Sequence, residues 1–191
     1  MEKIQILIDF FEKHLELSIE EKSYLKENIP IIVPHKGVIL LKEGDISSEF
    51  YFILKGGIRL FYNVNDVEKT AFFYFENKFV SSYESFTRQT PSEHNLQTIE
   101  DTTIAVFKHE VVYKLLELFP RFEFLVRIMM EEELIVCQDI IASFISLNAE
   151  ERYLKLIDTN YELIQRIPLQ HLATYLGMSR ESLSRIRNRI Q

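Results

Sequence analysis

The sequence of 191 residues predicts an α+β protein. We expect an N-terminal antiparallel β-roll of the jelly-roll (double-stranded β-helix) type with flanking helices, one long central helix, and a C-terminal all-α domain with a helix-turn-helix. Three observations predict this architecture. Short segments rich in β-branched and aromatic residues recur between turns over 30–108. A stretch without Gly or Pro follows at 121–146, and the later segments have helical patterns. The expected domains are therefore 1–120, 121–147 and 148–191.

The β-roll is expected to follow two short helices at 2–14 and 18–28. Ser18 and Glu21 have the spacing of a capping box, which marks the start of the second helix. Glycines and the run from Asn63 to Asp66 supply turns between the strands that follow. Regularly spaced short strands of this kind are typical of an antiparallel sandwich or barrel. The expected strands are 30–35, 38–42, 50–55, 57–63, 69–75, 95–99 and 102–108.

A helix at 109–118 should end before Pro120, and the long helix should then begin. Apolar residues in the long helix lie on two sides, whereas a helix with one buried face needs a single stripe. Two stripes predict two partners, namely the β-roll and a second copy of the chain, although an ordinary core helix is the alternative. The acidic run 131–133 is expected to face water. One stripe is Phe122, Leu125, Met129 and Val136, and the other is Val126, Met130, Cys137, Ile141 and Phe144.

Composition excludes several classes of protein. No run of 18 apolar residues is present, and the N-terminus lacks the features of a signal peptide, so we expect a cytoplasmic protein. The single cysteine, Cys137, excludes an internal disulfide and a Cys-only iron–sulfur site. The net charge of −7 argues against nucleic-acid binding only if the charge of the whole chain is considered. Residues 176–191 carry four arginines against one acid, Glu181, and a local basic patch is what phosphate binding requires.

The last 24 residues, 168–191, contain a helix-turn-helix pattern. A helix is expected to begin at Pro168, and Gly177 should end it in a left-handed conformation. Ala173 is small enough for two helices to approach closely, and Leu183 and Ile186 face inward from the second helix. Such a pair places its second helix in the major groove of DNA. The alternatives are a plain helical hairpin, or cations that only complement the helix dipole.

The outward face of the second helix carries groups that can read bases. Arginine can donate two hydrogen bonds to guanine, and glutamate can accept one from cytosine. We therefore expect double-stranded DNA as a partner, with base contacts near the start of the helix and phosphate contacts further along. The expected base-contacting residues are Ser179, Arg180, Glu181, Ser182 and Arg185, and the expected phosphate-contacting residues are Arg187 and Arg189.

Two segments resemble the Crp/Fnr family of transcription regulators. The string SRESLSRIR resembles the family's recognition helix, and LLKEGDISSEFYFILKGGIRLF at 40–61 resembles its β-roll. The long helix 121–146 sits where the family places its dimerisation helix. The resemblance implies a homodimer on a palindromic GTGA-like site, in which Arg180 and Arg185 contact guanines and Glu181 a cytosine. It also implies RNA polymerase as a partner.

The sequence departs from the family at the cyclic-nucleotide site. Members that bind cyclic nucleotides have Gly-Glu and Arg-Ser at positions where this chain has Ser81-Ser82 and His94-Asn95. Without the paired arginine, a buried phosphate has no counter-ion, so we predict no cofactor and no tight cyclic-AMP binding. The pocket is expected to hold another small effector or none, and a response to cyclic AMP is the alternative. The candidate pocket residues are Ser81, Ser82, Tyr83, Glu84, His94 and Asn95.

Two other functions compete with the regulator. A cupin-like enzyme would share the jelly roll, but it needs a His-x-His pair for its metal, and no two of the five histidines are two residues apart. We therefore predict neither a metal site nor an enzyme. A sensor that acts through another protein is the second rival, and the arginine-rich terminal helix argues against it.

Overall fold

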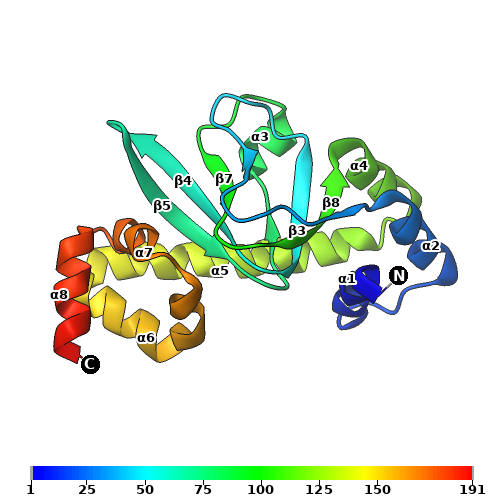
Figure 1. Ribbon diagram of the computed structural model, residues 1–191. Coiled ribbons are helices and arrows are strands. Elements are labelled where there is room, and N and C mark those ends of the chain that lie inside the picture. The colour runs from blue at the N-terminus through cyan, green and yellow to red at the C-terminus, as the bar shows by residue number, and fades with distance from the viewer. Residues whose placement is uncertain (1, 191) are drawn as a thin grey trace.

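Figure 1 shows the fold in a computed structural model that describes residues 2–190, apart from the side chains of Glu2, Leu163 and Ile190. Two four-stranded antiparallel sheets form the β-roll, which confirms the predicted fold class. One sheet has the order β1 (Ile31–Ile32), β8 (Thr103–Lys108), β3 (Glu49–Lys55) and β6 (Phe79–Val80). The other has the order β2 (Ile39–Leu41), β7 (Asn95–Thr98), β4 (Ile58–Val64) and β5 (Val67–Tyr74).

The helices surround this roll and extend it at one end (Figure 1). The capping box is present at α2, where the Ser18 side chain accepts the Glu21 N–H and the Glu21 carboxylate accepts the Ser18 N–H. The helices are α1 (Glu2–Glu12), α2 (Ile19–Asn28), α3 (Tyr83–Arg88), α4 (His109–Leu118), α5 (Phe122–Ser146), α6 (Ala149–Arg166), α7 (Leu169–Tyr175) and α8 (Arg180–Ile190).

The hairpin of β4 and β5 is the longest ladder of the roll. Its register runs from Ile58 opposite Tyr74 to Val64 opposite Val67. The two turn residues, Asn65 and Asp66, have φ values of 51° and 60°. Both central residues of a type I′ turn need positive φ, and Asn and Asp tolerate it well. The turn is therefore formed by the last two residues of the predicted Asn63–Asp66 run, and both strands extend to it.

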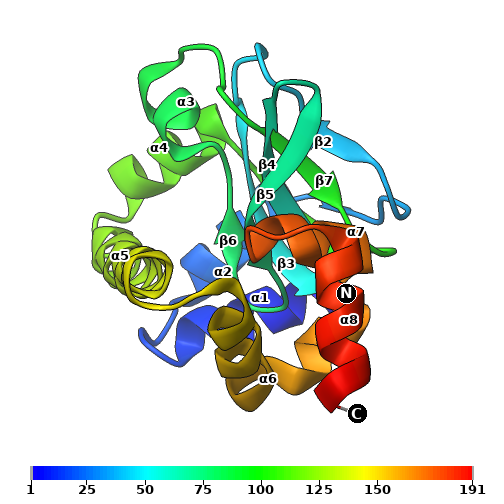
Figure 2. The same cartoon turned by 90° about the vertical axis from the view of Figure 1, so that its left-hand side faces the viewer.

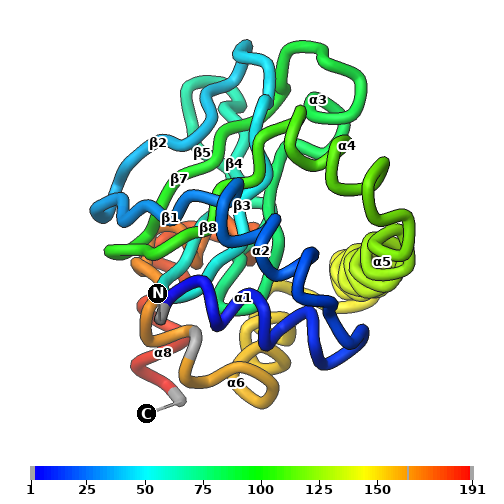
Figure 3. The backbone as a smooth tube through the Cα atoms, turned by 90° about the vertical axis from the view of Figure 1, so that its right-hand side faces the viewer, coloured from blue at the N-terminus to red at the C-terminus, as the bar shows by residue number. Residues whose placement is uncertain are grey.

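Two clusters of buried side chains form the core of the β-roll. Between the sheets lie residues from both, including Ile53 and Ile104 of one sheet and Ile58 and Leu96 of the other. A second cluster joins the outer face of β3 and β8 to α1, α2, α4 and the start of α5. Figure 3 shows α1 and α2 beside the first turns of α5. The N-terminal helices are therefore part of the core and hold the base of α5 on the roll.

The expected strands leave the segment between 75 and 95 without secondary structure, and this was wrong in part. It contains the short strand β6, which pairs with β3, and the helix α3. Arg88 is the last residue of α3 and donates to Glu84 at 2.7 Å within the helix. Sequence patterns missed both elements because a two-residue strand and a six-residue helix are too short to show a period.

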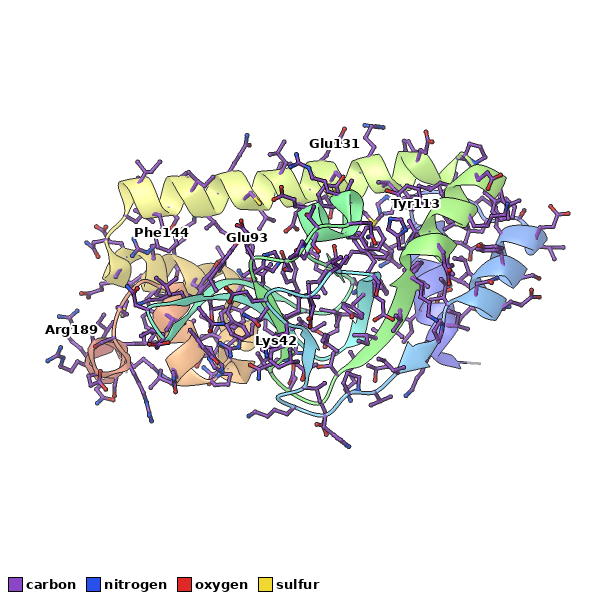
Figure 4. The ribbon with its side chains drawn as sticks, turned by 90° about the horizontal axis from the view of Figure 1, so that it is seen from above. Lys42, Glu93, Tyr113, Glu131, Phe144 and Arg189 are labelled. Carbon is purple, nitrogen blue, oxygen red and sulfur yellow. The ribbon has the colours of Figure 1, made fainter. Side chains whose placement is uncertain are left out.

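The acidic run of α5 faces water in part: Glu131 and Glu132 are exposed, as predicted, and Glu133 is half-buried. Glu131 points away from the rest of the chain, as Figure 4 shows, and pairs with Arg127. Glu132 lies 3.3 Å from Lys78, and Glu133 accepts the Tyr74 hydroxyl at 2.9 Å. Successive helical residues are 100° apart, so three in a row cannot share one environment. Two of these carboxylates therefore face the β-roll.

The C-terminal helices pack beside the β4–β5 hairpin (Figure 2). α6 extends to Arg166 and bends at Asn160, which has φ −145° and ψ 41°. α7 lies against β5, where the Thr174 hydroxyl accepts the Thr70 N–H at 3.3 Å. The Phe73 ring meets Tyr175 edge to face at the same contact. The C-terminal domain therefore has a direct interface with the β-roll of its own chain.

Arg166 links these two parts through charge. Its guanidinium donates to Glu76 at 2.8 and 2.9 Å, and to Glu100 at 3.0 Å, and it lies 4.7 Å from the centre of the Phe75 ring. Burial raises the pKa of Glu76, but the hydrogen bonds from Arg166 and from the Gly56 N–H outweigh it and bring the pKa below its ordinary value. Glu76 is therefore ionised at neutral pH and pairs with Arg166.

Within residues 2–190, none of the helices combines the length and the apolar composition that crossing a membrane requires.

Replacing Arg166 by methionine would leave two carboxylates facing each other without a counter-charge. Because this pair is about one-third exposed, we expect Arg166→Met to lower the free energy of unfolding by about 1–2 kcal/mol in urea denaturation at pH 7. Arg127→Met, which removes the more exposed pair with Glu131, is the control and should cost less than about 0.5 kcal/mol. Equal losses in the two variants would contradict the role given to Arg166.

Candidate nucleic-acid interface and adjoining cavity

A glycine turn sets the angle between α7 and α8. Gly177 has φ 71°, as the sequence predicts, and its N–H donates to the Thr174 carbonyl at 3.1 Å. The Met178 N–H then donates to the Ala173 carbonyl at 3.0 Å. A Cβ atom at Gly177 would lie 3.2 Å from the Arg152 guanidinium, so both the backbone and the space favour glycine here.

The two helices share a small apolar core. Leu172, Ala173, Leu176 and Leu183 are buried, as expected, and Tyr153 of α6 joins them. Ile186 is partly buried against the same cluster. Because these residues occupy the inward face of α8, the opposite face of the helix points to solvent.

The first turn of α8 is capped by Ser179, whose hydroxyl accepts the Ser182 N–H at 3.1 Å. Glu181 is exposed, and its pKa is lowered by its own backbone N–H, then by the Ser179 hydroxyl and the nearby Arg180 and Arg185. The carboxylate is therefore ionised at neutral pH and stands between two guanidinium groups. The cap also marks the N-terminus of α8, and the partial positive charge of a helix N-terminus attracts anions.

We define the recognition face as the exposed residues Arg180, Glu181 and Arg185, with Ser179 and Ser182 at its start. Arg185 donates to the Ser182 hydroxyl at 3.3 Å, and otherwise these three charged side chains have no ion-pair partner within residues 2–190. The structure therefore brings together the five residues for which the sequence predicts base contacts.

The two arginines predicted to contact phosphates are placed differently. Arg189 forms an ion pair with Glu150 of α6, and Figure 4 shows it at the end of the molecule. Arg187 is half-buried. Burial raises the pKa of the Tyr153 hydroxyl, and the nearby charge of Arg187 lowers it by less, so the pKa is raised overall. The pairing with Glu150 could not be foreseen because the two residues are 39 positions apart.

Arg152 is a structural residue that the sequence did not single out. Its guanidinium donates to the Leu147 carbonyl at 2.6 Å and to the Leu176 carbonyl at 2.8 Å, and it lies over the Phe144 ring. Leu147 ends α5, and Leu176 ends α7. Figure 4 shows Phe144 on the side of α5 that faces the C-terminal domain. One side chain thus ties the end of the long helix to the turn before α8.

The interface between α7 and β5 contains a buried polar network. Arg59 is almost completely buried and donates to Gln97 at 2.9 Å. It also pairs with Glu68 and lies 3.9 Å from the centre of the Phe61 ring. His171 of α7 stands near this group, and the burial of the imidazole, with the charge of Arg59, lowers its pKa to about 4.

A cavity of about 460 Å³ lies between the β-roll and α5, and we call it the α5 cavity. Strands β4, β5 and β6, the segment through α3, and the middle of α5 supply its walls. Of the predicted pocket residues, Ser81, Tyr83, Glu84 and His94 line it. From α5 it receives Met129, Met130, Glu132, Glu133, Leu134 and Cys137.

The other two predicted pocket residues serve the β-roll itself. Ser82 is buried, and its hydroxyl is 3.0 Å from that of Ser92. Asn95 is also buried, and its side-chain oxygen accepts the Glu43 N–H at 3.0 Å. Because their polar atoms are satisfied inside the roll, neither side chain lines the α5 cavity.

The polar atoms of the α5 cavity differ in how well they are satisfied. Among the described residues, the Ser81 hydroxyl and His94 Nε2 are buried without a hydrogen-bond partner. Burial lowers the pKa of His94, so its imidazole is neutral at pH 7. On the α5 side, burial and then the charge of Glu133 raise the pKa of the Cys137 thiol. The cavity thus holds neutral donors and acceptors beside carboxylates.

In the described part of the chain, no group of three or more His, Cys, Asp or Glu side chains is arranged to hold a metal ion.

Comparisons with known proteins agree with this architecture. Residues 34–118 match the family described as "Cyclic nucleotide-binding domain". No curated protein sequence matches the chain. The regulator CLP of Xanthomonas campestris, described as c-di-GMP-responsive, is 16% identical with a TM-score of 0.75, over 91% of this chain and 92% of that one. A protein of Eubacterium rectale, described as a transcriptional regulator of the Crp/Fnr family, is 16% identical with a TM-score of 0.73, over 92% and 84%.

FixK2 of Bradyrhizobium japonicum is 15% identical with a TM-score of 0.72, over 85% of this chain and 84% of that one. The chain has the Crp/Fnr fold. This confirms, at the level of the fold, the resemblance that the two sequence motifs indicated. Within the Crp/Fnr fold, the recognition face lies on the last helix, and the α5 cavity lies beside the central one.

We expect acid to weaken the interface between α7 and β5 in this Crp/Fnr fold, because His171 lies there. In the folded chain its pKa is about 4, whereas an unfolded histidine titrates near 6.5, so the unfolded state binds the proton first. The stability contributed by neutral His171 is therefore complete above about pH 6.5 and is lost as the pH falls from 6.5 toward 4.

We expect His171→Gln to reduce the loss of stability between pH 7.5 and 5.5 by about 1 kcal/mol, measured by urea denaturation at both pH values. His14→Gln, at an exposed histidine of the N-terminal segment, is the control and should leave the loss unchanged. A His171→Gln profile that overlays the wild-type profile would show that His171 is protonated equally in both states.

Proposed function

We propose that this chain is a sequence-specific DNA-binding transcription regulator of the Crp/Fnr type, which binds a palindromic site as a homodimer. The observation that carries the proposal is the recognition face. Arg180, Glu181 and Arg185 of α8 are exposed, while Leu183 of the same helix is buried. A rigid helix with charged hydrogen-bonding groups along one exposed edge fits the major groove.

The chemistry of the recognition face indicates how bases would be read. Each guanidinium can donate two hydrogen bonds to O6 and N7 of a guanine, and the Glu181 carboxylate can accept one from N4 of a cytosine. The charges of Arg180 and Arg185 also help to keep the Glu181 carboxylate ionised. We therefore assign direct readout to these three residues, with Ser179 and Ser182 close to the DNA backbone.

Phosphate contacts fall to Arg187 and Arg189. Arg189 is about two-thirds exposed in its pair with Glu150, and a surface pair of this kind contributes little to stability. A DNA phosphate can therefore replace Glu150 as the partner of Arg189. Such contacts release counter-ions, so binding should weaken steeply as salt is raised.

The outer side of α5 supports the homodimer. Leu134, Ile135, Ile141 and Ile145 are more than half exposed, with 59%, 59%, 59% and 82% of their surface accessible. Leu134, Ile141 and Ile145 lie on one stripe, at spacings of seven and four residues, and Ile135 lies beside it. Such a stripe is the pattern of a helix that packs on a second helix. A two-fold axis along α5 would present two recognition faces to successive major grooves about 34 Å apart.

The remaining assignments follow from this proposal. The regulator would work in the cytoplasm with RNA polymerase as its protein partner, and it would not be an enzyme. The match of residues 34–118 to the cyclic nucleotide-binding domain supports a second candidate, a regulator that responds to cyclic AMP. The lining of the α5 cavity among the described residues includes no arginine to neutralise a phosphate, which favours a different effector or constitutive binding.

Selection of duplexes from a random pool should return a palindrome with half-sites centred about 10 base pairs apart. On the selected site, Arg180→Ala should weaken binding by about 1–3 kcal/mol and relax the preference at one base pair in each half-site. Arg88→Ala, at an exposed arginine of α3 outside the recognition face and outside α5, is the matched control and should bind as the wild type does. If Arg180→Ala weakened binding to all sequences equally, Arg180 would be a phosphate contact and the assigned readout would be wrong.

The dimer can be tested separately from DNA binding. Burying a glutamate in an apolar helix pair is costly, so the double variant Ile135→Glu, Ile145→Glu should sediment as a monomer of 22.7 kDa where the wild type sediments at twice that mass. The control is Ile19→Glu on α2, where the residue is 85% exposed and lies outside α5. A wild type that is monomeric at micromolar concentration would contradict the homodimer.

A further inference from the structure

We propose that the α5 cavity binds an uncharged, mostly apolar small molecule, with a polar group that pairs with Ser81 or His94, and that it rejects anions. This inference concerns the effector of the proposed regulator and rests on that function only for its biological role. The structure supports it through the polar atoms without partners, the sign of the charges, and the apolar walls of the cavity.

Two buried polar atoms indicate where the ligand's polar group would lie. Ser81 Oγ and His94 Nε2 both belong to side chains that line the α5 cavity, and both are buried without a partner. Leaving a buried polar atom unpaired costs free energy, and a ligand that pairs with it recovers that free energy on binding. A hydroxyl can donate or accept, and so can a neutral imidazole. An amine N–H, a hydroxyl or an amide of a ligand would satisfy either atom.

The charges of the cavity favour a ligand without negative charge. Glu84, Glu132 and Glu133 line it, and Lys78 is the one cation among its described lining residues. Lys78 is already paired with Glu132. An anion in this cavity would therefore meet net negative charge and no free cation, and it would also have to give up its hydration.

The walls of the cavity suit an apolar body. Leu60, Phe72 and Phe79 of the β-roll face Met129 and Met130 of α5 across it. A second cavity of about 250 Å³ shares Phe79, Met129 and Met130 with it, and its described lining includes no charged residue. Methionine side chains are flexible and adapt to irregular shapes. The ligand's apolar part would therefore lie against the two methionines, at the boundary between the cavities.

A pair of fluorescent probes tests the sign of the charge directly. N-phenyl-1-naphthylamine is neutral and has one N–H, and 8-anilinonaphthalene-1-sulfonate has the same aromatic skeleton with a negative charge. We expect the neutral probe to bind the full chain saturably, with one probe per chain, and the anionic probe to bind at least about 10-fold more weakly. Equal affinity for the two probes, or no saturable binding of the neutral one, would overturn the proposal.

Two kinds of variant test whether the probes bind in the α5 cavity: one removes a charge from its lining, and the other fills the cavity with a larger side chain. Glu133→Gln should raise the affinity for the anionic probe several-fold while leaving the neutral probe within about 2-fold. Glu123→Gln, at an exposed position of the same helix, should change neither affinity. If Glu133→Gln left the anionic probe unchanged, the carboxylates would not be the cause of its exclusion.

Ser81→Phe and Cys137→Phe fill the α5 cavity from its two sides, and each should reduce the affinity for the neutral probe about 10-fold or more. Val112→Phe, which fills the neighbouring cavity, is the control. Urea denaturation identifies any variant that fails to fold, and either filling variant alone suffices. Unchanged binding in a folded filling variant would place the probe elsewhere and overturn the proposal.

The duplex selection described above needs no probe. Failure of the probe experiments therefore leaves the DNA-binding function standing, and failure of the duplex selection leaves the ligand proposal standing.

Discussion

The burial of one small apolar cluster determines which side of α8 faces outward. Leu172 and Leu176 of α7 and Leu183 of α8 can be removed from water together only if Gly177 adopts its left-handed conformation. Once they are buried, the helical period turns Glu181 and Arg185 away from the cluster, and Arg180 in the first turn of α8 is exposed as well. The position of the charged groups is thus a consequence of apolar packing, and the proposed reading of DNA depends on it.

The same structure connects this cluster to the rest of the chain by two routes. Arg152 joins the end of α5 to the end of α7, and Arg166 joins the C-terminal domain to Glu76 of the β-roll. The α5 cavity is lined by the middle of α5, so a ligand there contacts the element that leads to Arg152. A ligand can shift the recognition faces only if it binds two arrangements of these contacts with different affinity. The α5 cavity and the α7–β5 interface are the places where such arrangements would differ.

Features set by neighbouring residues could be predicted from the sequence. The capping box at Ser18, the left-handed Gly177 and the long helix through 121–146 all follow from local signals, and the structure confirms them. The exposed side of α8 could be predicted because an amphipathic helix reveals it through its own period, whereas the base contacts of that side stay a prediction. Four of the six pocket residues were also found, since the resemblance placed the segment around 81–95.

Features set by distant residues could not be predicted. The pairing of Arg189 with Glu150, and that of Arg166 with Glu76, join residues far apart in the sequence. The role of Glu133 in the cavity depends on how α5 is rotated against β5, and a run of three acids gives no signal about rotation. Ser82 and Asn95 are polar residues whose partners lie inside the roll, and only the structure distinguishes them from pocket residues.

The most direct measurement is a crystal structure of the full chain bound to a duplex chosen by selection. The account predicts two copies related by a two-fold axis along α5, with α8 in the major groove and the guanidinium groups of Arg180 and Arg185 within hydrogen-bond distance of guanine edges. A complex in which α8 faces away from the duplex, or in which these arginines contact the protein alone, would contradict it.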